Sequence, residues 1–482
     1  MKIIISTLNI ISVLLCLYGY TFTNINICAY GVLILITSFF VYSLMNNSTR
    51  RLLTIFLISF FTFLLGKISY DLIILNQLSF ESYFSEKVLI DSLIILAISI
   101  YSLWIGFIVS EHFVKSKKVG LIHIELNNSK RNCMILSSKF LYFVTLIPAV
   151  YSIISAINYT RMNGYLALYN SYRGSNLIID RLADMNQIAF LLYLSCFPKK
   201  NSSKLLLFTF ICLQILNILT GRRGETIANL LLLFFYFMSR SDIILTLRGK
   251  NIEKNWMNKG KYLWIVAFTP ILLVLLNIVS IVRRDAVIKG NFWQLLFSFF
   301  DQQGVSFNVI AHSVALKDTL ANMNSNYFFG PIIIFLRNNI ITRVIFGIEP
   351  LIPQTVEMAM NGNLLSESLS FLVMPSTYLN GGGIGNSYIS ELYVDFGILG
   401  IVIFNFLLGG ILCAISIQSS TKPWWGAIRL LVISSILLMP RSSSLNFVVS
   451  FINITTILTF GLFYIIYLFL IQYVQKLSGV NK

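Results

Sequence analysis

The sequence predicts an all-α integral membrane protein that crosses the bilayer about twelve times, within a range of eleven to fourteen, and carries a large extracytoplasmic loop segment. Hydrophobic residues make up 56% and charged residues 11% of its 482 residues, and the mean hydropathy is +0.79. A soluble chain of this length has a lower apolar fraction. The cations fall in short clusters between long apolar runs, which is how membrane orientation is encoded. The formal charge of +17 therefore reflects topology, and we expect no nucleic-acid partner.

The predicted helices follow from apolar runs, most of them close to the roughly 20 residues that cross a hydrocarbon core. They lie at about 3–20, 27–45, 52–75, 88–109, 140–158, between Asp184 and Lys199, at 205–219, between Glu225 and Arg240, and at 262–282, 396–417, 426–439 and 446–472. The first run follows Met1 and Lys2 without a signal-peptide cleavage site, so we expect it to be a retained helix.

Lysine content assigns the loops to the two sides of the membrane. Three lysine-rich loops are predicted to be cytoplasmic, at 110–135, 199–204 and 239–261. The alternation then places the loops at 159–184, 221–225 and 283–390 outside. Both termini are expected to be cytoplasmic.

The predicted organisation has three parts: helices 1 to 9 with short loops at 1–282, a large outside segment at 283–390, and helices 10 to 12 at 391–482. The large segment contains two apolar stretches, 292–300 and 327–346, which we expect to be interfacial or re-entrant. If 292–316 and 327–346 both spanned the membrane, the count would be fourteen. Only Lys317 would then anchor the loop between them on the cytoplasmic side, so we prefer twelve.

A glycine-rich loop joins this segment to the tenth predicted helix, and the stretch from Gly381 to Gly400 reads GGGIGNSYISELYVDFGILG. Glycines let a backbone approach a ligand closely, so the candidate sugar-contacting residues are Gly381, Gly382, Gly383, Gly385 and Tyr388. Glu391 and Asp395 share a helix face, since they are four residues apart. The alternative is a glycine hinge with two interfacial acids that stay in water.

Few side chains on the predicted outside could act as a general acid or base. Glu391 is the first candidate base, because the neighbouring Asp395 carboxylate would raise its proton affinity. His312 is the second candidate, as the one histidine on the outside.

Arginine is enriched on the predicted outside, where ten arginines face four lysines, whereas sixteen lysines face six arginines inside. Orientation rules do not require arginine outside, but arginine binds phosphate in a bidentate manner. The candidate diphosphate-binding residues are Arg173, Arg222, Arg223, Arg283, Arg284 and Arg441. The alternative is that these arginines contact lipid head groups. Several arginines could stabilise a departing diphosphate without a metal.

Metal and cofactor sites are not predicted. The six cysteines have no CxxC spacing, the three histidines are scattered, and no D-x-D pair occurs. We therefore expect no disulfide, no zinc site and no cofactor.

The glycine loop, the S-Y-I-S-E-L-Y-V-D-F-G-x-L-G pattern and the helix after it resemble the O-antigen and oligosaccharide repeat-unit polymerases of the Wzy family. The resemblance implies a fold like the GT-C membrane glycosyltransferases and a location in the bacterial inner membrane. It also implies an enzyme that transfers a growing polysaccharide from undecaprenyl diphosphate onto a lipid-linked repeat unit, with a periplasmic active site. A chain-length regulator is a possible partner. The alternatives are an O-antigen ligase, which differs in its acceptor, and a lipid-linked oligosaccharide flippase or transporter, against which the long outside segment argues.

Overall fold

The computed structural model describes most of the chain. The described residues are 2–45, 47–79, 83–115, 122–125, 129–164, 166–170, 172, 174, 176–220, 223–240, 243–247, 250–253, 256–283, 287–288, 290–417 and 422–477.

Ten stretches among the described residues are long and apolar enough to cross a membrane, which confirms the all-α polytopic class. They comprise α1 (Lys2–Thr21), α2 (Ile25–Leu44), Thr49–Leu75, α5 (Glu86–Lys115), α6 (Ser129–Asn163), α9 (Lys200–Leu219), α11 (Lys259–Arg283), α20 (Tyr388–Ser416), α21 (Pro423–Leu438) and α23 (Ile454–Leu477). The sixth and eighth predicted helices form as α8 (Leu177–Ser195) and α10 (Arg223–Ser239) but fall outside this set. Helix α8 carries three charged residues near its start, and α10 has only 17 residues.

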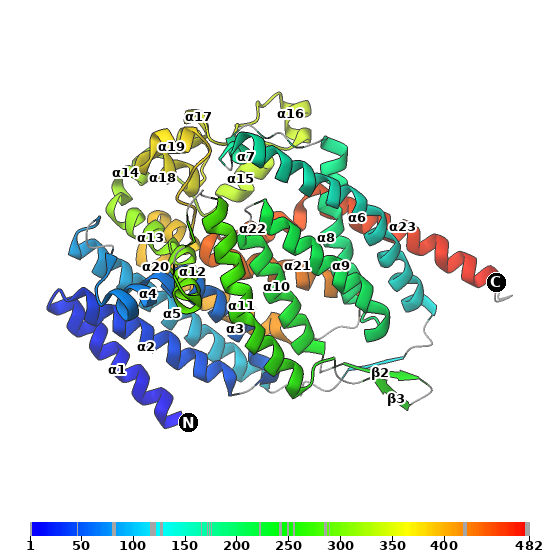
Figure 1. Cartoon of the computed structure of the whole chain (residues 1–482), viewed down its shortest axis with the longest axis horizontal. Coiled ribbons are helices and arrows are strands. Elements are labelled where there is room, and N and C mark those ends of the chain that lie inside the picture. The colour runs from blue at the N-terminus through cyan, green and yellow to red at the C-terminus, as the bar shows by residue number, and fades with distance from the viewer. Residues whose placement is uncertain are drawn as a thin grey trace. The chain divides into compact units, whose positions relative to one another are not determined.

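The chain forms two compact units, each assembled from segments that are distant in the sequence. Unit 1 contains Met1–Lys118, Phe268–Ile417 and Leu437–Asn446, whereas unit 2 contains Val119–Ala267, Gln418–Ile436 and Phe447–Lys482. Figure 1 shows the helices in chain order from blue to red. The glycine loop, His312 and both candidate acids all belong to unit 1.

In unit 1, α20 packs closely along α5 because glycines remove the side chains at the crossing. A Cβ atom at Gly106 would collide with the Phe406 carbonyl, and one at Gly409 would collide with the Leu103 carbonyl. Small residues at such contacts let transmembrane helices approach each other. This packing fixes the position of the helix that carries Glu391 and Asp395.

The third membrane helix is interrupted by two π-helical turns, since α3 (Asn47–Phe60) continues as η1 (Phe61–Leu65), α4 (Gly66–Tyr70) and η2 (Asp71–Leu75). Such turns occur often at functional sites. Helix α12 (Phe292–Gln303) crosses α4 at two glycines, Gly66 of α4 and Gly304 at the end of α12. A Cβ at Gly304 would collide with the backbone of Lys67. The residues at the end of α12 therefore lie directly against the third membrane helix.

The segment between α11 and α20 folds into short helices, and none of those after α12 is longer than ten residues. They are α13 (Ser306–Ala315), α14 (Lys317–Met323), α15 (Gly330–Arg337), α16 (Ile340–Phe346), α17 (Val356–Asn361), α18 (Leu365–Val373) and α19 (Pro375–Leu379). The stretches 292–316 and 327–346 are therefore broken helices that are too short to span, which supports the smaller helix count. Figure 1 shows α17, α18 and α19 gathered beside one another.

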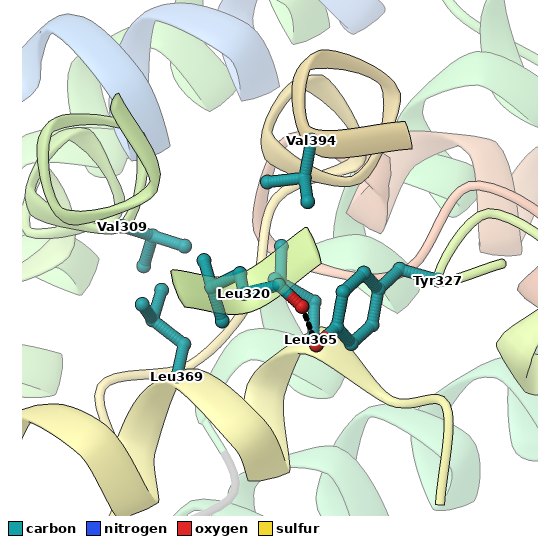
Figure 2. Close-up of a cluster of buried hydrophobic side chains, with 6 residues drawn as sticks. All are labelled: Val309, Leu320, Tyr327, Leu365, Leu369 and Val394. Atoms are coloured by element: carbon teal, nitrogen blue, oxygen red, sulfur yellow. Dashed lines mark hydrogen bonds between the residues drawn. The ribbon is translucent and has the colours of Figure 1, made fainter. Parts of the chain in front are cut away.

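A buried apolar cluster joins these short helices to α20 (Figure 2). It contains Val309, Leu320, Tyr327, Leu365, Leu369 and Val394. The Tyr327 hydroxyl donates a hydrogen bond to the Leu320 carbonyl over 3.0 Å, which satisfies the polar group of this tyrosine. His312 lies one helical turn after Val309, and Asp395 follows Val394, so both groups sit on elements that this cluster holds together.

Unit 2 is built around α6, which packs against α8 and α23. It also contains a three-stranded sheet that the sequence did not predict, formed by β1 (Ile122–Glu125), β2 (Ile243–Leu247) and β3 (Lys250–Glu253). Strands β1 and β2 pair in parallel, and β2 and β3 pair antiparallel. Ile124, Ile243 and Leu245 pack with Phe197 beneath the sheet. The two predicted loops at 110–135 and 239–261 are therefore joined to each other by strand pairing.

Candidate functional site

The glycine loop is anchored to the helices that precede it. The Gly382 N–H donates to the Thr377 carbonyl over 2.8 Å, and the Ile384 N–H donates to Ser370 Oγ over 3.1 Å. Gly381 and Gly385 have φ angles of 95° and 89°, in the region that only glycine adopts without strain. Gly381 and Gly382 are buried, whereas Gly383 and Gly385 are exposed. Of the four glycines predicted to contact a ligand, only Gly383 and Gly385 are thus exposed at the surface.

Tyr388, which the sequence analysis placed among the sugar contacts, is fully buried. Its hydroxyl donates a hydrogen bond to Asn405 Oδ1 over 2.7 Å. Because Asn405 lies 17 residues further along α20, this bond joins the two ends of a stretch in which the helix changes direction. The structure thus places Tyr388 inside the protein, away from any sugar at the surface.

Glu391 is also fully buried, and both of its carboxylate oxygens accept hydrogen bonds. Asn386 Nδ2 donates to Oε1 over 2.7 Å. The backbone N–H and the hydroxyl of Ser444 both donate to Oε2, each over 2.8 Å. A buried carboxyl group needs such donors, since it has lost its hydration. Glu391 therefore joins the start of α20 to a turn that lies more than fifty residues later.

The Asn386 amide extends this network. Its Nδ2 donates a second bond to Ser443 Oγ over 2.8 Å, and its Oδ1 accepts from the Ser387 N–H over 2.8 Å. Asn386, Ser443 and Ser444 are at most 8% exposed. We call Asn386, Glu391, Ser443 and Ser444 the serine-turn network.

Asp395 is held separately from Glu391. Its Oδ2 accepts a hydrogen bond from the Phe328 N–H over 2.7 Å, and the side chain is half-buried. The helix breaks just after it, because Gly397 has φ 62° and ψ −153°. The two acids keep the predicted one-turn spacing, but each carboxylate has its own set of donors.

His312 lies on α13 and is half-buried. Its ring meets the Phe84 ring edge to face, with 4.6 Å between centroids. Burial lowers the pKa of His312 below its ordinary value of 6.5, because the charged form loses hydration. The imidazole is therefore neutral near neutral pH and has a lone pair that can accept a proton.

Among the six candidate diphosphate-binding arginines, Arg441 is the one whose side chain the structure describes. Its Nη1 donates to Gln303 Oε1 at the end of α12 over 2.8 Å, and its guanidinium lies 5.7 Å from the Phe63 ring centroid. Arg173, Arg222 and Arg284 fall outside the described residues, as do the side chains of Arg223 and Arg283. The convergence of these arginines on one anion stays a prediction.

No role was predicted for Lys67 and Asp71, although two charged residues spaced four apart within an apolar run are a signal that the sequence contains. Lys67 Nζ lies 2.8 Å from Asp301 Oδ1 and 3.7 Å from Asp71 Oδ1. Asp71 is fully buried, and its Oδ2 accepts two hydrogen bonds from Ser79. This ion-pair cluster lies beside the crossing of α4 and α12. Its Asp301 is two residues before Gln303, which accepts the hydrogen bond from Arg441.

No group of three metal-ligating side chains lies together within the part of the chain that the structure describes. The polar groups described above in unit 1 are carboxylates, amides, serines, His312, Lys67 and the Arg441 guanidinium.

The fold and this site define a polytopic membrane protein in which one long inter-helix segment meets a broken membrane helix at a group of buried and half-buried polar side chains. A family model described as O-antigen polysaccharide polymerase Wzy matches residues 2–475. The protein belongs to this family, as the glycine-loop pattern indicated. No curated protein and no solved structure matches the chain significantly.

Proposed function

We propose that this member of the O-antigen polymerase family transfers a growing polysaccharide from undecaprenyl diphosphate onto a lipid-linked repeat unit at the periplasmic face of the inner membrane. The observation that carries the proposal is the folding of residues 292–379 into short helices that a buried cluster fixes to α20. Such a layer can exclude water from a glycosyl transfer, which a loop that only connects two helices does not need to do.

In this proposal, arginines bind the diphosphate of the donor and stabilise the charge that develops on it as the glycosidic bond breaks. Arg441 is the best-supported of them, because Gln303 and the Phe63 ring already orient its guanidinium. Arg173, Arg222, Arg223, Arg283 and Arg284 complete the proposed set on sequence grounds.

The acceptor hydroxyl must lose a proton to a side chain within hydrogen-bond reach. Asp395 and His312 are half-buried, so both retain some access, whereas Glu391 is fully buried. We assign the base to Asp395, since the Phe328 N–H orients its carboxylate. His312 is the second candidate, and Glu391 takes the role described in the next section.

An extension assay tests this function. Purified protein in lipid nanodiscs is given the lipid-linked repeat unit of its source organism, and the products are resolved by chain length. A polymerase yields a ladder of longer lipid-linked chains, and the proposal includes that a chelator leaves this ladder unchanged.

Three other results would contradict the proposal. Movement of intact repeat units across a sealed membrane without extension would indicate a transporter. Extension only onto a lipid A acceptor would indicate a ligase. Loss of the ladder in chelator would refute the metal-free mechanism.

A further inference from the structure

We infer that Glu391 is a positioning residue, which fixes the turn that carries Arg441 through the serine-turn network. The inference rests on the proposed function in one respect, namely that Arg441 binds the donor diphosphate. It differs from a base role, in which Glu391 would touch the acceptor sugar.

The bonding of Glu391 supports this role. Its two oxygens accept three hydrogen bonds of 2.7 to 2.8 Å from Asn386 and Ser444, and the side chain has 0% exposure. A base must come within roughly 2.6–3.2 Å of the hydroxyl that it deprotonates. The acceptor sugar cannot approach Glu391 this closely while the network is formed.

The bonds reach the backbone of the turn that follows Arg441. The 3₁₀ turn η5 (Met439–Arg441) ends at Arg441, and three residues later the Ser444 N–H is held by Glu391. On the other side of the turn, Arg441 donates to Gln303 of α12. The turn is thus fixed at one end by α20 and at the other by α12, which leaves Arg441 little freedom to change its direction.

The same network fixes the exit of the glycine loop. Asn386 donates to Glu391 and to Ser443, and it directly follows the exposed Gly385. A change at Glu391 would therefore disturb two places at once, the glycine loop and the Arg441 turn. These two segments are far apart in the sequence, and the buried carboxylate and its donors hold them together.

A polarity swap separates positioning from base catalysis. In Glu391→Gln, the new amide nitrogen meets the Asn386 amide nitrogen, so two donors face each other. Adding Asn386→Asp restores the network, because the amide introduced at position 391 can donate to the carboxylate introduced at position 386. Ser443 turns its hydroxyl to donate to that carboxylate as well, and the oxygen of the introduced amide still accepts from Ser444. The double variant keeps these bonds but has no carboxylate at position 391.

We expect Glu391→Gln to lower the extension rate by about tenfold to a hundredfold and the double variant to recover most of that loss. A Glu391 base would leave both variants equally inactive, which would overturn the inference.

Combining Glu391→Gln with Arg441→Lys separates positioning from a general loss of packing. A general loss of packing predicts that the two substitutions have independent effects. Positioning predicts non-additivity, because both changes raise the apparent KM for the lipid-linked donor by removing the same interaction.

Hydrogen exchange provides a readout that does not need activity. The Ser444 amide should exchange slowly in the wild type, faster in Glu391→Gln, and slowly again in the double variant. If the wild type extends no chains but this pattern holds, the proposed function fails and the network stands. If chains are extended but the Ser444 amide is unaffected by Glu391→Gln, the positioning role fails.

Discussion

Access to solvent distinguishes the ionisable side chains around the broken helix. Asp395 and His312 are half-buried, whereas Glu391 and Asp71 are fully buried and already accept bonds from neighbouring donors. Buried carboxylates with several donors hold structure in place, and partly exposed ones can meet a substrate. The residues expected to act on the sugar are therefore those with greater access to solvent.

Asp395→Asn tests the proposed base. We expect the extension rate to fall by about a hundredfold or more, since a general base contributes this much. The oxygen of the introduced amide can still accept from the Phe328 N–H, so the melting temperature should change little. The exposed Asp318, which lies on α14, provides the matched control as Asp318→Asn. Extension by Asp395→Asn at the wild-type rate would transfer the base role to His312.

The buried histidine predicts how stability depends on pH. Burial lowers the pKa of His312, so below about pH 6.5 the unfolded chain binds a proton that the folded protein resists. The free energy of unfolding should therefore fall as the pH drops from about 7 to about 5. Melting temperatures across this range should show a smaller fall for His312→Gln.

The exposed His112 supplies the control for this experiment. His112→Gln should leave the wild-type pH dependence in place. An identical pH dependence in wild type and His312→Gln would show that burial of His312 does not contribute.

Helix α20 consists of two helical parts, and Gly397 between them adopts a backbone conformation that is almost exclusive to glycine. The first part carries Tyr388, Glu391 and Asp395, and the second continues as the membrane helix. The direction of the first part is therefore set by one glycine and by the Tyr388–Asn405 bond.

Gly397→Ala should destabilise the protein through its backbone alone. The nearest atom to an added Cβ is Lys317 Nζ at 3.9 Å, so there is room for the methyl group, but the conformation costs about 1–3 kcal/mol in any other residue. We expect a lower melting temperature and a loss of extension. Gly461→Ala is the control, because a Cβ there meets nothing within 4 Å and the residue lies inside a regular helix. Equal melting temperatures for the two variants would show that the break is not needed.

The membrane helices could be predicted from the sequence because a long apolar run has few alternatives to a transmembrane helix. The break at Gly397 could not, since a single glycine in an apolar run is compatible with a continuous helix. The β1–β2 pairing could not be predicted either, because its strands are four or five residues long and lie more than a hundred residues apart.

The same limit applied to the site. The motif contains Glu391, but the partner of this residue, Ser444, lies 53 residues away, and no local pattern relates the two.

Sidedness is a property of the whole chain that labelling can test. Ser202 and Ser376 are both exposed, and the predicted topology places them inside and outside, respectively. An impermeant thiol reagent applied to intact spheroplasts should label Ser376→Cys but not Ser202→Cys. Five of the native cysteines are buried and Cys212 is half-buried, so the background should be low. Labelling of Ser202→Cys would reverse the assignment of every loop.

The discontinuous make-up of unit 1 has a consequence for biogenesis. Glu391 enters the membrane region while the chain is still being synthesised. Its donor Asn386 has then already been made, but its other donor, Ser444, lies 53 residues later and leaves the ribosome after it. Until then, the nascent protein holds a carboxylate whose permanent partners are incomplete. A chain truncated after Leu438 should therefore be degraded faster in a pulse-chase experiment than one truncated after Asn446, because only the second contains η5 and the serine turn. Quality control in the membrane would then read the completion of this turn as the sign that the last segment of unit 1 has been made.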